Sequence, residues 1–352
     1  FIDAGFLAVV YGGVDEGKYL CSHDLVDTLH ITGSDKTYDA IVWGETAAER
    51  ARAKAEGRRR LDKPFTSELG NVTPILVVPG RWSKRELAWQ ARHVVAAVAH
   101  NASFDCVAGK VLVLARGWEQ REAFVGLVKE GLRALPPRKA YYPGAERRYA
   151  EMCGCYPGAE VLGARGELVV PWTYFPDVPP QKGETALTQE AFCGVLAEVN
   201  LDVTDTEDYL RAATRFCNDD VWGTLACFLL TGGDVEARHH AAFEQALEEL
   251  RYGTIGVNLW PGAIFGFMSP SWGAFPGHTD VDIQSGRGVV HNTSLLDHPQ
   301  KSVVRSPVRL PVTPPWFADH RNLLGVGQSL LRLEQRYSPI GVALAFPSLL
   351  KG

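Results

Sequence analysis

Short apolar runs alternate with amphipathic stretches along most of the chain. The apolar runs are rich in β-branched and aromatic residues and end near Gly, Ser or Asn, which is typical of buried strands. The predicted strands cover residues 6–13, 26–34, 75–78, 110–117, 190–201, 222–233 and 254–260. The predicted helices cover residues 15–24, 35–43, 45–63, 83–99, 121–135, 204–219, 234–253 and 323–337. Because strands and helices alternate, we expect an α/β fold with layers and largely parallel sheets.

Three regions depart from this alternation. Residues 136–180 are rich in Pro, Gly and Tyr, and we expect a loop with short strands there. Residues 273–288 are rich in Gly and predict a further loop. The tail contains a β-like run over residues 301–312.

One stretch combines this pattern with chemically useful side chains. A strand-like run ends in the carboxylate of Glu68, a Gly turn follows, and a second apolar strand runs from Ile75 to Val78. The amphipathic helix over residues 83–99 then leads into a polar loop that holds Cys106. The pattern therefore predicts an acid/base group and a soft nucleophile on two loops beside one sheet.

Composition sets broad limits on the kind of protein. The chain has 352 residues, enough for about two domains, and its hydrophobic content of 46% with 22% charged residues indicates a globular protein. The net charge of −5 gives no basic field, so we expect no nucleic-acid partner. No apolar run reaches the roughly 18 residues that a membrane span needs, and no signal peptide is visible.

The cysteines indicate a reducing compartment. There are seven, an odd number, and most are scattered along the chain. Free thiols in the cytoplasm fit this usage better than a disulfide framework. The chain opens at Phe1 rather than Met, and we expect it to be part of a longer protein.

Each candidate residue also has a plainer interpretation. A free cysteine such as Cys106 is usually buried and inert, and a carboxylate such as Glu68 is more often an ion-pair partner than a base. The polar loop around Cys106 favours a reactive thiol, and Gly70 beside Glu68 allows close approach of a ligand.

Other motifs point less clearly to chemistry. Gly33 and Ser34 end a strand and precede a helix, an arrangement that binds phosphate but is also an ordinary turn with an N-cap. Cys153 and Cys155 lack a second Cys or His pair at ligand spacing, so we predict no metal site. We expect the His239–His240 pair on a helix surface, and nothing in the sequence assigns a role to His278.

Seven segments, taken in order, resemble the NAD(P)-dependent aldehyde dehydrogenases. The first three are similar to that family's phosphate turn, base motif and nucleophile loop, and the last four to segments that follow them. The segments are ITGS (31–34), SELGNVTP (67–74), NASFDC (101–106), EAFCGVL (190–196), CNDDVWGTLACFLLT (217–231), GTIGVNLW (253–260) and WGAFPGHTDVDIQSGRG (272–288). Together they cover most of residues 5–290, whereas the tail beyond His291 matches poorly.

The resemblance implies a function and a set of site residues. An aldehyde is oxidised to a carboxylic acid with NAD or NADP, through a hemithioacetal and a thioester on Cys106, and Glu68 activates water. The cofactor-binding residues that the resemblance implies are Gly33, Ser34, Leu69, Gly70, Glu190 and Phe192. The implied fold is a partial Rossmann-type nucleotide-binding domain followed by an α/β catalytic domain with a mostly parallel sheet.

The chain also departs from the family pattern. Ser103 and Phe104 replace the Gly and Gln before the nucleophile, and Cys193–Gly194 replaces a Gly-Pro pair. The family's N-terminal region, with the first half of the nucleotide-binding sheet, has no counterpart here.

These departures leave alternatives open. We expect residues 1–70 to be the second half of the nucleotide-binding domain, 71–290 the catalytic thiol domain, and 291–352 a tail with an oligomerisation strand at 301–312. The open sheet edge near residues 6–34 predicts a homo-oligomer, or a second chain that completes the nucleotide-binding domain. The alternative functions are an acylating dehydrogenase that uses coenzyme A and a catalytically silent assembly module.

Overall fold

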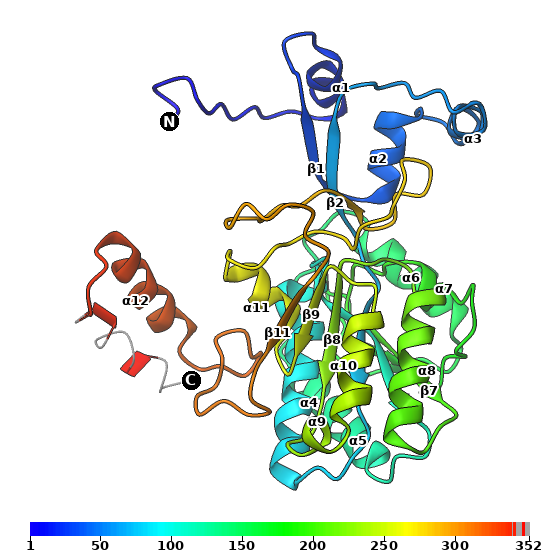
Figure 1. Ribbon diagram of the computed structural model, residues 1–352, viewed down its shortest axis with the longest axis vertical. Coiled ribbons are helices and arrows are strands. Elements are labelled where there is room, and N and C mark those ends of the chain that lie inside the picture. Colours follow the sequence, from blue (N-terminus) through cyan, green and yellow to red (C-terminus); the bar gives the residue numbers. More distant parts are fainter. Residues whose placement is uncertain (340, 343–346, 349–352) are drawn as a thin grey trace.

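The computed structural model describes residues 1–339, 341–342 and 347–348. Within these residues the strands form two sheets, one of three strands and one of eight. The small sheet lies above the large one in Figure 1, and the C-terminal helix α12 (Leu323–Gln335) stands to one side. The end of the expected tail, at 340, 343–346 and 349–352, lies outside the described residues.

The small sheet has the order β1-β2-β10. Its strands are β1 (Leu29–Gly33), β2 (Phe65–Leu69) and β10 (Gly286–Arg287), and its helices are α1 (Val14–Ser22), α2 (Asp35–Val42) and α3 (Ala47–Glu56). Strands β1 and β2 are parallel, and β10 returns from a later part of the chain to pair antiparallel with β2. Its own core is formed by Tyr38, Val42, Trp43, Leu69 and Ile283.

The large sheet has the order β11-β9-β8-β3-β4-β7-β6-β5. Its strands are β3 (Thr73–Val77), β4 (Gly109–Ala115), β5 (Glu160–Val161), β6 (Thr173–Phe175), β7 (Val195–Leu201), β8 (Ala226–Leu230), β9 (Thr254–Val257) and β11 (Ser302–Arg305). All neighbouring pairs are parallel except β5 with β6. The central strands are buried along their whole length, as expected for a parallel sheet covered on both faces. The expected α/β fold with a mostly parallel sheet is confirmed.

Helices cover both faces of the large sheet. They are α4 (Lys84–Ala99), the 3₁₀ turn η1 (His100–Ser103), α5 (Arg121–Ala134), α6 (Ala145–Cys155), α7 (Thr185–Thr188), α8 (Thr206–Asp219), α9 (Val235–Arg238), α10 (His240–Glu249) and α11 (Pro261–Gly266). Helices α4 and α5 pack together, as do α8 and α10. Right-handed crossovers that run in opposite directions along the sheet place these two pairs on opposite faces.

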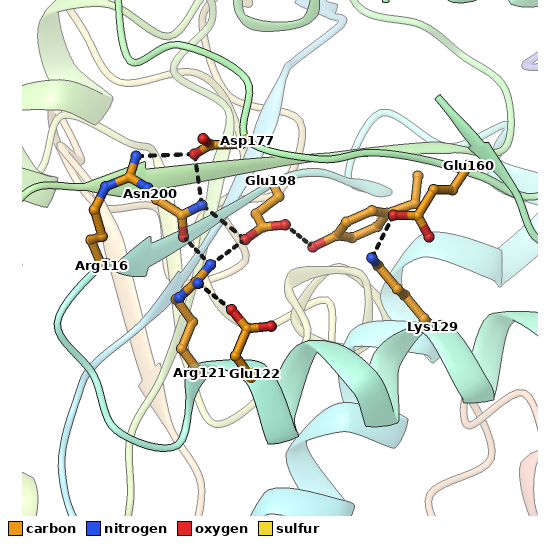
Figure 2. Close-up of polar contacts among 9 residues, drawn as sticks. Arg116, Arg121, Glu122, Lys129, Glu160, Asp177, Glu198 and Asn200 are labelled. Carbon is orange, nitrogen blue, oxygen red and sulfur yellow. Dashed lines mark hydrogen bonds and ion pairs between the residues drawn. The ribbon is translucent and has the colours of Figure 1, made fainter. Parts of the chain in front are cut away.

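A buried polar network fastens α5 to the sheet (Figure 2). Arg121, in the first turn of α5, donates hydrogen bonds to Glu198 at 2.8 Å and to Asn200 at 3.1 Å, both on β7. The Tyr174 hydroxyl donates to the second oxygen of Glu198 at 2.7 Å. Each buried carboxylate oxygen of Glu198 therefore has a donor, which is the condition for a buried charge to be tolerated.

Three predicted elements are wrong or incomplete. Residues 6–13 form no strand, and Phe6 and Tyr11 are exposed, because β1 is an edge strand with no neighbour on that side for these residues to join. Helix α6 lies in the region predicted as loop. Only two of its residues, Ala145 and Met152, are buried, so the sequence there shows no clear apolar helical pattern. The predicted helix 234–253 is broken at His239 into α9 and α10.

Within the described ranges, none of the helices has the length and apolar character that crossing a membrane requires.

Candidate active site

The register of the small sheet brings two sequence motifs to one edge. Thr32 lies opposite Glu68, and Gly33 lies opposite Leu69, in the parallel pair β1–β2. The carboxyl ends of both strands therefore meet at the same edge, the position where open α/β sheets bind ligands. The chain continues from β2 through Gly70 directly into β3, so this edge faces the amino ends of the strands of the large sheet.

Cys106 lies on the loop between α4 and β4, at that amino edge. Helix α4 begins with a capping box, in which Ser83 and Glu86 bond to each other's backbone N–H groups. The chain then turns sharply because Asn101, Ala102 and Ser103 all have positive φ, at 48°, 55° and 70°. This left-handed turn reverses the chain so that the next residues return along β4.

The structure brings Glu68 and Cys106 together. The Glu68 side chain is buried, with 4% of its surface exposed. Burial raises the pKa of Glu68, and the nearby thiol of Cys106 and indole of Trp272 partly oppose that rise. Burial, and then the carboxylates of Glu68 and Asp105, raise the pKa of the Cys106 thiol well above its usual range.

The two groups are close without being tightly paired. Glu68 Oε1 is buried, and among the described residues it has no hydrogen-bond partner of normal geometry. Trp272 Nε1 likewise has none within that part of the chain. A buried carboxylate oxygen without a donor is costly, and this is a position where a water or substrate atom would be stabilised.

Glu190 points into the same site. One of its oxygens accepts a hydrogen bond from the Asn71 backbone N–H at 3.2 Å. A Cβ on Gly70 would lie 2.2 Å from the other oxygen, so a larger residue there would displace the Glu190 carboxylate. Burial raises the pKa of Glu190 to about 7, against the opposing effects of the Asn71 N–H and Lys110.

The remaining residues implied by the resemblance lie around this edge. Ser34 is the N-cap of α2, and its hydroxyl accepts a hydrogen bond from the Thr37 N–H at 3.1 Å. Phe192 has a φ of 43°, and its ring contacts Tyr142 and Phe104 at centroid distances of 4.8 and 5.8 Å. Leu69 is buried in the core of the small sheet, and its backbone N–H donates to the Ser285 carbonyl at 2.9 Å.

Sequence reasoning missed Lys110. This lysine is 4% exposed, and its ammonium donates to the Ser103 hydroxyl at 2.6 Å and to the Cys193 carbonyl at 3.0 Å. In the sequence it looks like a charge flanking an apolar strand. Only its position as the second residue of β4, four residues after Cys106, could have indicated a role near the site.

Other candidates lie away from this site. Cys153 and Cys155 lie on α6, and within the described residues no group of His, Cys, Asp or Glu could hold a metal. His239 contacts Glu207 at 3.1 Å, and His278 shares a hydrogen bond of 2.6 Å with Thr224. A cavity of about 460 Å³ includes His278 and Thr224 in its lining but neither Cys106 nor Glu68.

The fold is that of the aldehyde dehydrogenases. A crystal structure of γ-glutamyl-γ-aminobutyraldehyde dehydrogenase from Burkholderia cenocepacia superposes with a TM-score of 0.59 at 23% identity. The match covers 83% of this chain and 55% of that one. A Mycobacterium tuberculosis aldehyde dehydrogenase complexed with NAD⁺ gives a TM-score of 0.54 at 24% identity, over 79% of this chain and 52% of the other.

A third structure has the same fold with the other nicotinamide cofactor. It is an NADP-dependent glyceraldehyde-3-phosphate dehydrogenase from Bacillus halodurans complexed with NADP, with a TM-score of 0.54, 18% identity and coverage of 78% and 51%. This chain thus spans about half the length of the structures it matches. No protein-family model matches the sequence, and neither does any curated protein.

Proposed function

We propose that the protein oxidises an aldehyde to a carboxylic acid, with Cys106 as nucleophile and Glu68 as general base. The observation that carries this proposal is the meeting of the two side chains at the junction of the two sheets. Glu68 and Cys106 belong to separate elements, yet their side chains lie close enough to shift each other's pKa. This proximity supports the motif resemblance on grounds other than sequence.

The chemistry follows from the residue types. The Cys106 thiol loses its proton to Glu68 or to water, and its sulfur bonds to the carbonyl carbon, whose oxygen takes the electron pair. The Cys106 N–H, which donates to no acceptor in the described chain, is free to stabilise that oxyanion. Once the substrate carbon is oxidised to the thioester and Glu68 has passed any proton it holds to solvent, Glu68 removes a proton from water. The resulting hydroxide attacks the thioester carbon, and the C–S bond breaks to release the acid and return the electron pair to the Cys106 sulfur.

We propose that NAD or NADP binds at the carboxyl edge of the small sheet. When bound, it supplies the acceptor for the hydride that leaves the substrate carbon. The residues fit this group: Gly33 and Ser34 precede the N-terminus of α2, where a phosphate is favourably placed, and the Glu190 carboxylate lies against Gly70 at the same edge. Phe192 and the backbone of Leu69 complete the proposed set.

We further propose the domain division 1–70, 71–290 and 291–352, with β10 returning from the catalytic part to the small sheet. The edge position of β1 and the exposed residues 6–13 support a homo-oligomer, or a second polypeptide segment that covers them. The run 301–312, proposed as the oligomerisation strand, contains β11. This strand pairs with β9 and forms one edge of the large sheet. Light scattering on the purified protein would test this, and a monomer would count against it.

The proposed activity has a direct test. We expect the protein, given a panel of aldehydes with NAD⁺ or NADP⁺, to produce NADH or NADPH absorbance, and Cys106→Ala to abolish it. Cys155→Ala is the matched control because that thiol is exposed on α6. Activity that survives in Cys106→Ala would refute the mechanism.

Two alternatives give different outcomes. An acylating enzyme would require coenzyme A for turnover, which the placement of Glu68 beside Cys106 argues against. A catalytically silent module would show neither turnover nor saturable NAD binding. The reason to consider it is that Ser103 and Phe104 replace the residues usual before the nucleophile.

A further inference from the structure

The ammonium group of Lys110 is buried behind the loop that carries Cys106. Its Nζ donates to the Ser103 hydroxyl at 2.6 Å, to the Cys193 carbonyl at 3.0 Å and to the Ser103 carbonyl at 3.4 Å. An ammonium has three protons, so these acceptors use all of its donor capacity. Lys110 thereby connects the turn before Cys106 to Cys193, two residues before β7 begins.

That turn needs an external restraint. Asn101, Ala102 and Ser103 are consecutive non-glycine residues in the left-handed region, which Asn tolerates but Ala and Ser disfavour. Ser103 is fully buried, and both its hydroxyl and its carbonyl are held by the same ammonium. Such a conformation persists only where the surrounding structure fixes it, and the bonds from Lys110 are the charged part of that restraint.

The charge of Lys110 is balanced by its surroundings. Burial lowers the pKa of Lys110, and the carboxylates of Glu190 and Asp105 oppose this, as does the Cys193 sulfur when it is ionised. Arg148, on α6, acts in the same direction as burial. A buried lysine that keeps its proton needs such acids nearby.

We propose that Lys110 is a positioning residue for the nucleophile: its bonds to Ser103 and Cys193 fix the left-handed turn that presents Cys106 beside Glu68. This inference rests on the proposed role of Cys106. It predicts that the reactivity of Cys106 depends on a side chain that does not bind substrate.

The test measures the alkylation of Cys106 by iodoacetamide, followed by peptide mass spectrometry over a range of pH, without aldehyde or cofactor. We expect Lys110→Met to lower the rate at Cys106 about tenfold, the size of a lost charged hydrogen bond, and Lys110→Arg to restore part of it.

Controls come from other cysteines in the same sample. Cys155 is exposed and should react equally in all variants, and Cys227 is buried and should stay protected while the fold is intact. If Lys110→Met loses that protection, Ser103→Ala is the second variant, since it removes only the hydroxyl acceptor, and it should slow Cys106 by a smaller factor.

The outcomes separate this inference from the proposed function. A rate at Cys106 within twofold of the parent, in whichever of the two variants stays folded, overturns the positioning role. Slow alkylation in Lys110→Met together with an absence of dehydrogenase activity in the parent would support the role of Lys110 and reject the enzyme.

Discussion

At the scale of single residues, burial determines the chemistry of the site. Glu68 and Cys106 would have ordinary pKa values on an exposed loop, but both pKa values are raised here, first because burial disfavours the charged forms. The carboxylate of Glu68 raises the pKa of Cys106 further, whereas the thiol of Cys106 partly opposes the rise at Glu68. The thiol is therefore largely protonated at neutral pH, and the neighbouring carboxylate is a base within reach.

Glu68 provides the first prediction. Glu68→Gln keeps the side-chain shape but removes the base, and we expect the turnover rate to fall by about 10² to 10⁴. In the parent protein the acid limb of the pH–rate profile should lie above the usual range of a glutamate, because burial raises the pKa of Glu68. Steady-state kinetics across pH would check both points. Glu167→Gln, at an exposed position, should behave like the parent.

His93 provides a second prediction, on stability. It packs against Phe228 and Phe317 in the core, and burial lowers its pKa to about 3. Its stabilising contribution is complete above the unfolded pKa of 6.5 and is lost as pH falls toward 3. We expect this residue to cost about 2 kcal/mol of unfolding free energy between pH 7 and pH 5.

His93→Phe should remove that part of the acid sensitivity, measured by urea denaturation at both pH values. His240→Phe is a matched control, because His240 is exposed on α10. The same pH dependence in His93→Phe as in the parent would show that His93 is not the titrating group.

At the scale of elements, helices are attached to the large sheet by buried charges as well as by apolar contacts. Arg121 on α5 and Glu198 on β7 form the central pair of the network in Figure 2. Arg116 and Asp177, at the edge of the same network, are both largely exposed. Both are Arg–carboxylate pairs of one network, but the Arg116–Asp177 pair is more exposed, so solvent screens it more strongly.

This difference predicts unequal costs. Arg121→Ala leaves the buried carboxylate of Glu198 without its charge partner, and we expect a loss of about 3 kcal/mol in unfolding free energy. Arg116→Ala should cost less than about 1 kcal/mol because exposed ion pairs contribute little. Chemical denaturation of both variants checks the prediction, which equal losses would contradict.

At the scale of the whole molecule, the loop of residues 273–288 links the two sheets, in addition to the direct connection from β2 to β3. The Asp280 carboxylate accepts hydrogen bonds from the Tyr38 hydroxyl at 2.8 Å and from Arg59 at 3.2 Å, and also pairs with Arg287. Its backbone carbonyl accepts from the Trp43 indole at 2.9 Å. Asp280 therefore holds α2 to this loop, and His278 and Phe275 of the same loop bond to Thr224, just before β8 of the large sheet.

Loss of this clamp should loosen the small sheet selectively. We expect Asp280→Ala to increase hydrogen exchange in α2 and α3 while the exchange of β3 and β4 stays unchanged. Asp297→Ala, at an exposed position, serves as the control. If α2 and α3 exchange hydrogen as slowly in Asp280→Ala as in the control, the apolar core around Trp43 is sufficient to hold the two parts together.

Most of the helices and strands, and the pairing of Glu68 with Cys106, could be predicted from the amino-acid sequence alone. Apolar runs such as 226–230 and the capping signals of α4 and α8 specify local structure, because their periods and caps act over a few residues. The ordered motifs likewise predicted Glu68 and Cys106 as partners. They could not predict that residues 6–13 stay outside the sheet, since that depends on a neighbouring strand.

The groups that surround Glu68 and Cys106 could be identified only from the three-dimensional packing. Lys110 lies behind Ser103, and Glu190 fills the space above Gly70, because strands far apart in sequence are neighbours in the sheet. The raised pKa values of Glu68 and Cys106 have the same origin. Burial and electrostatic interactions act through space, and the distances that set them do not exist until the two sheets have packed together.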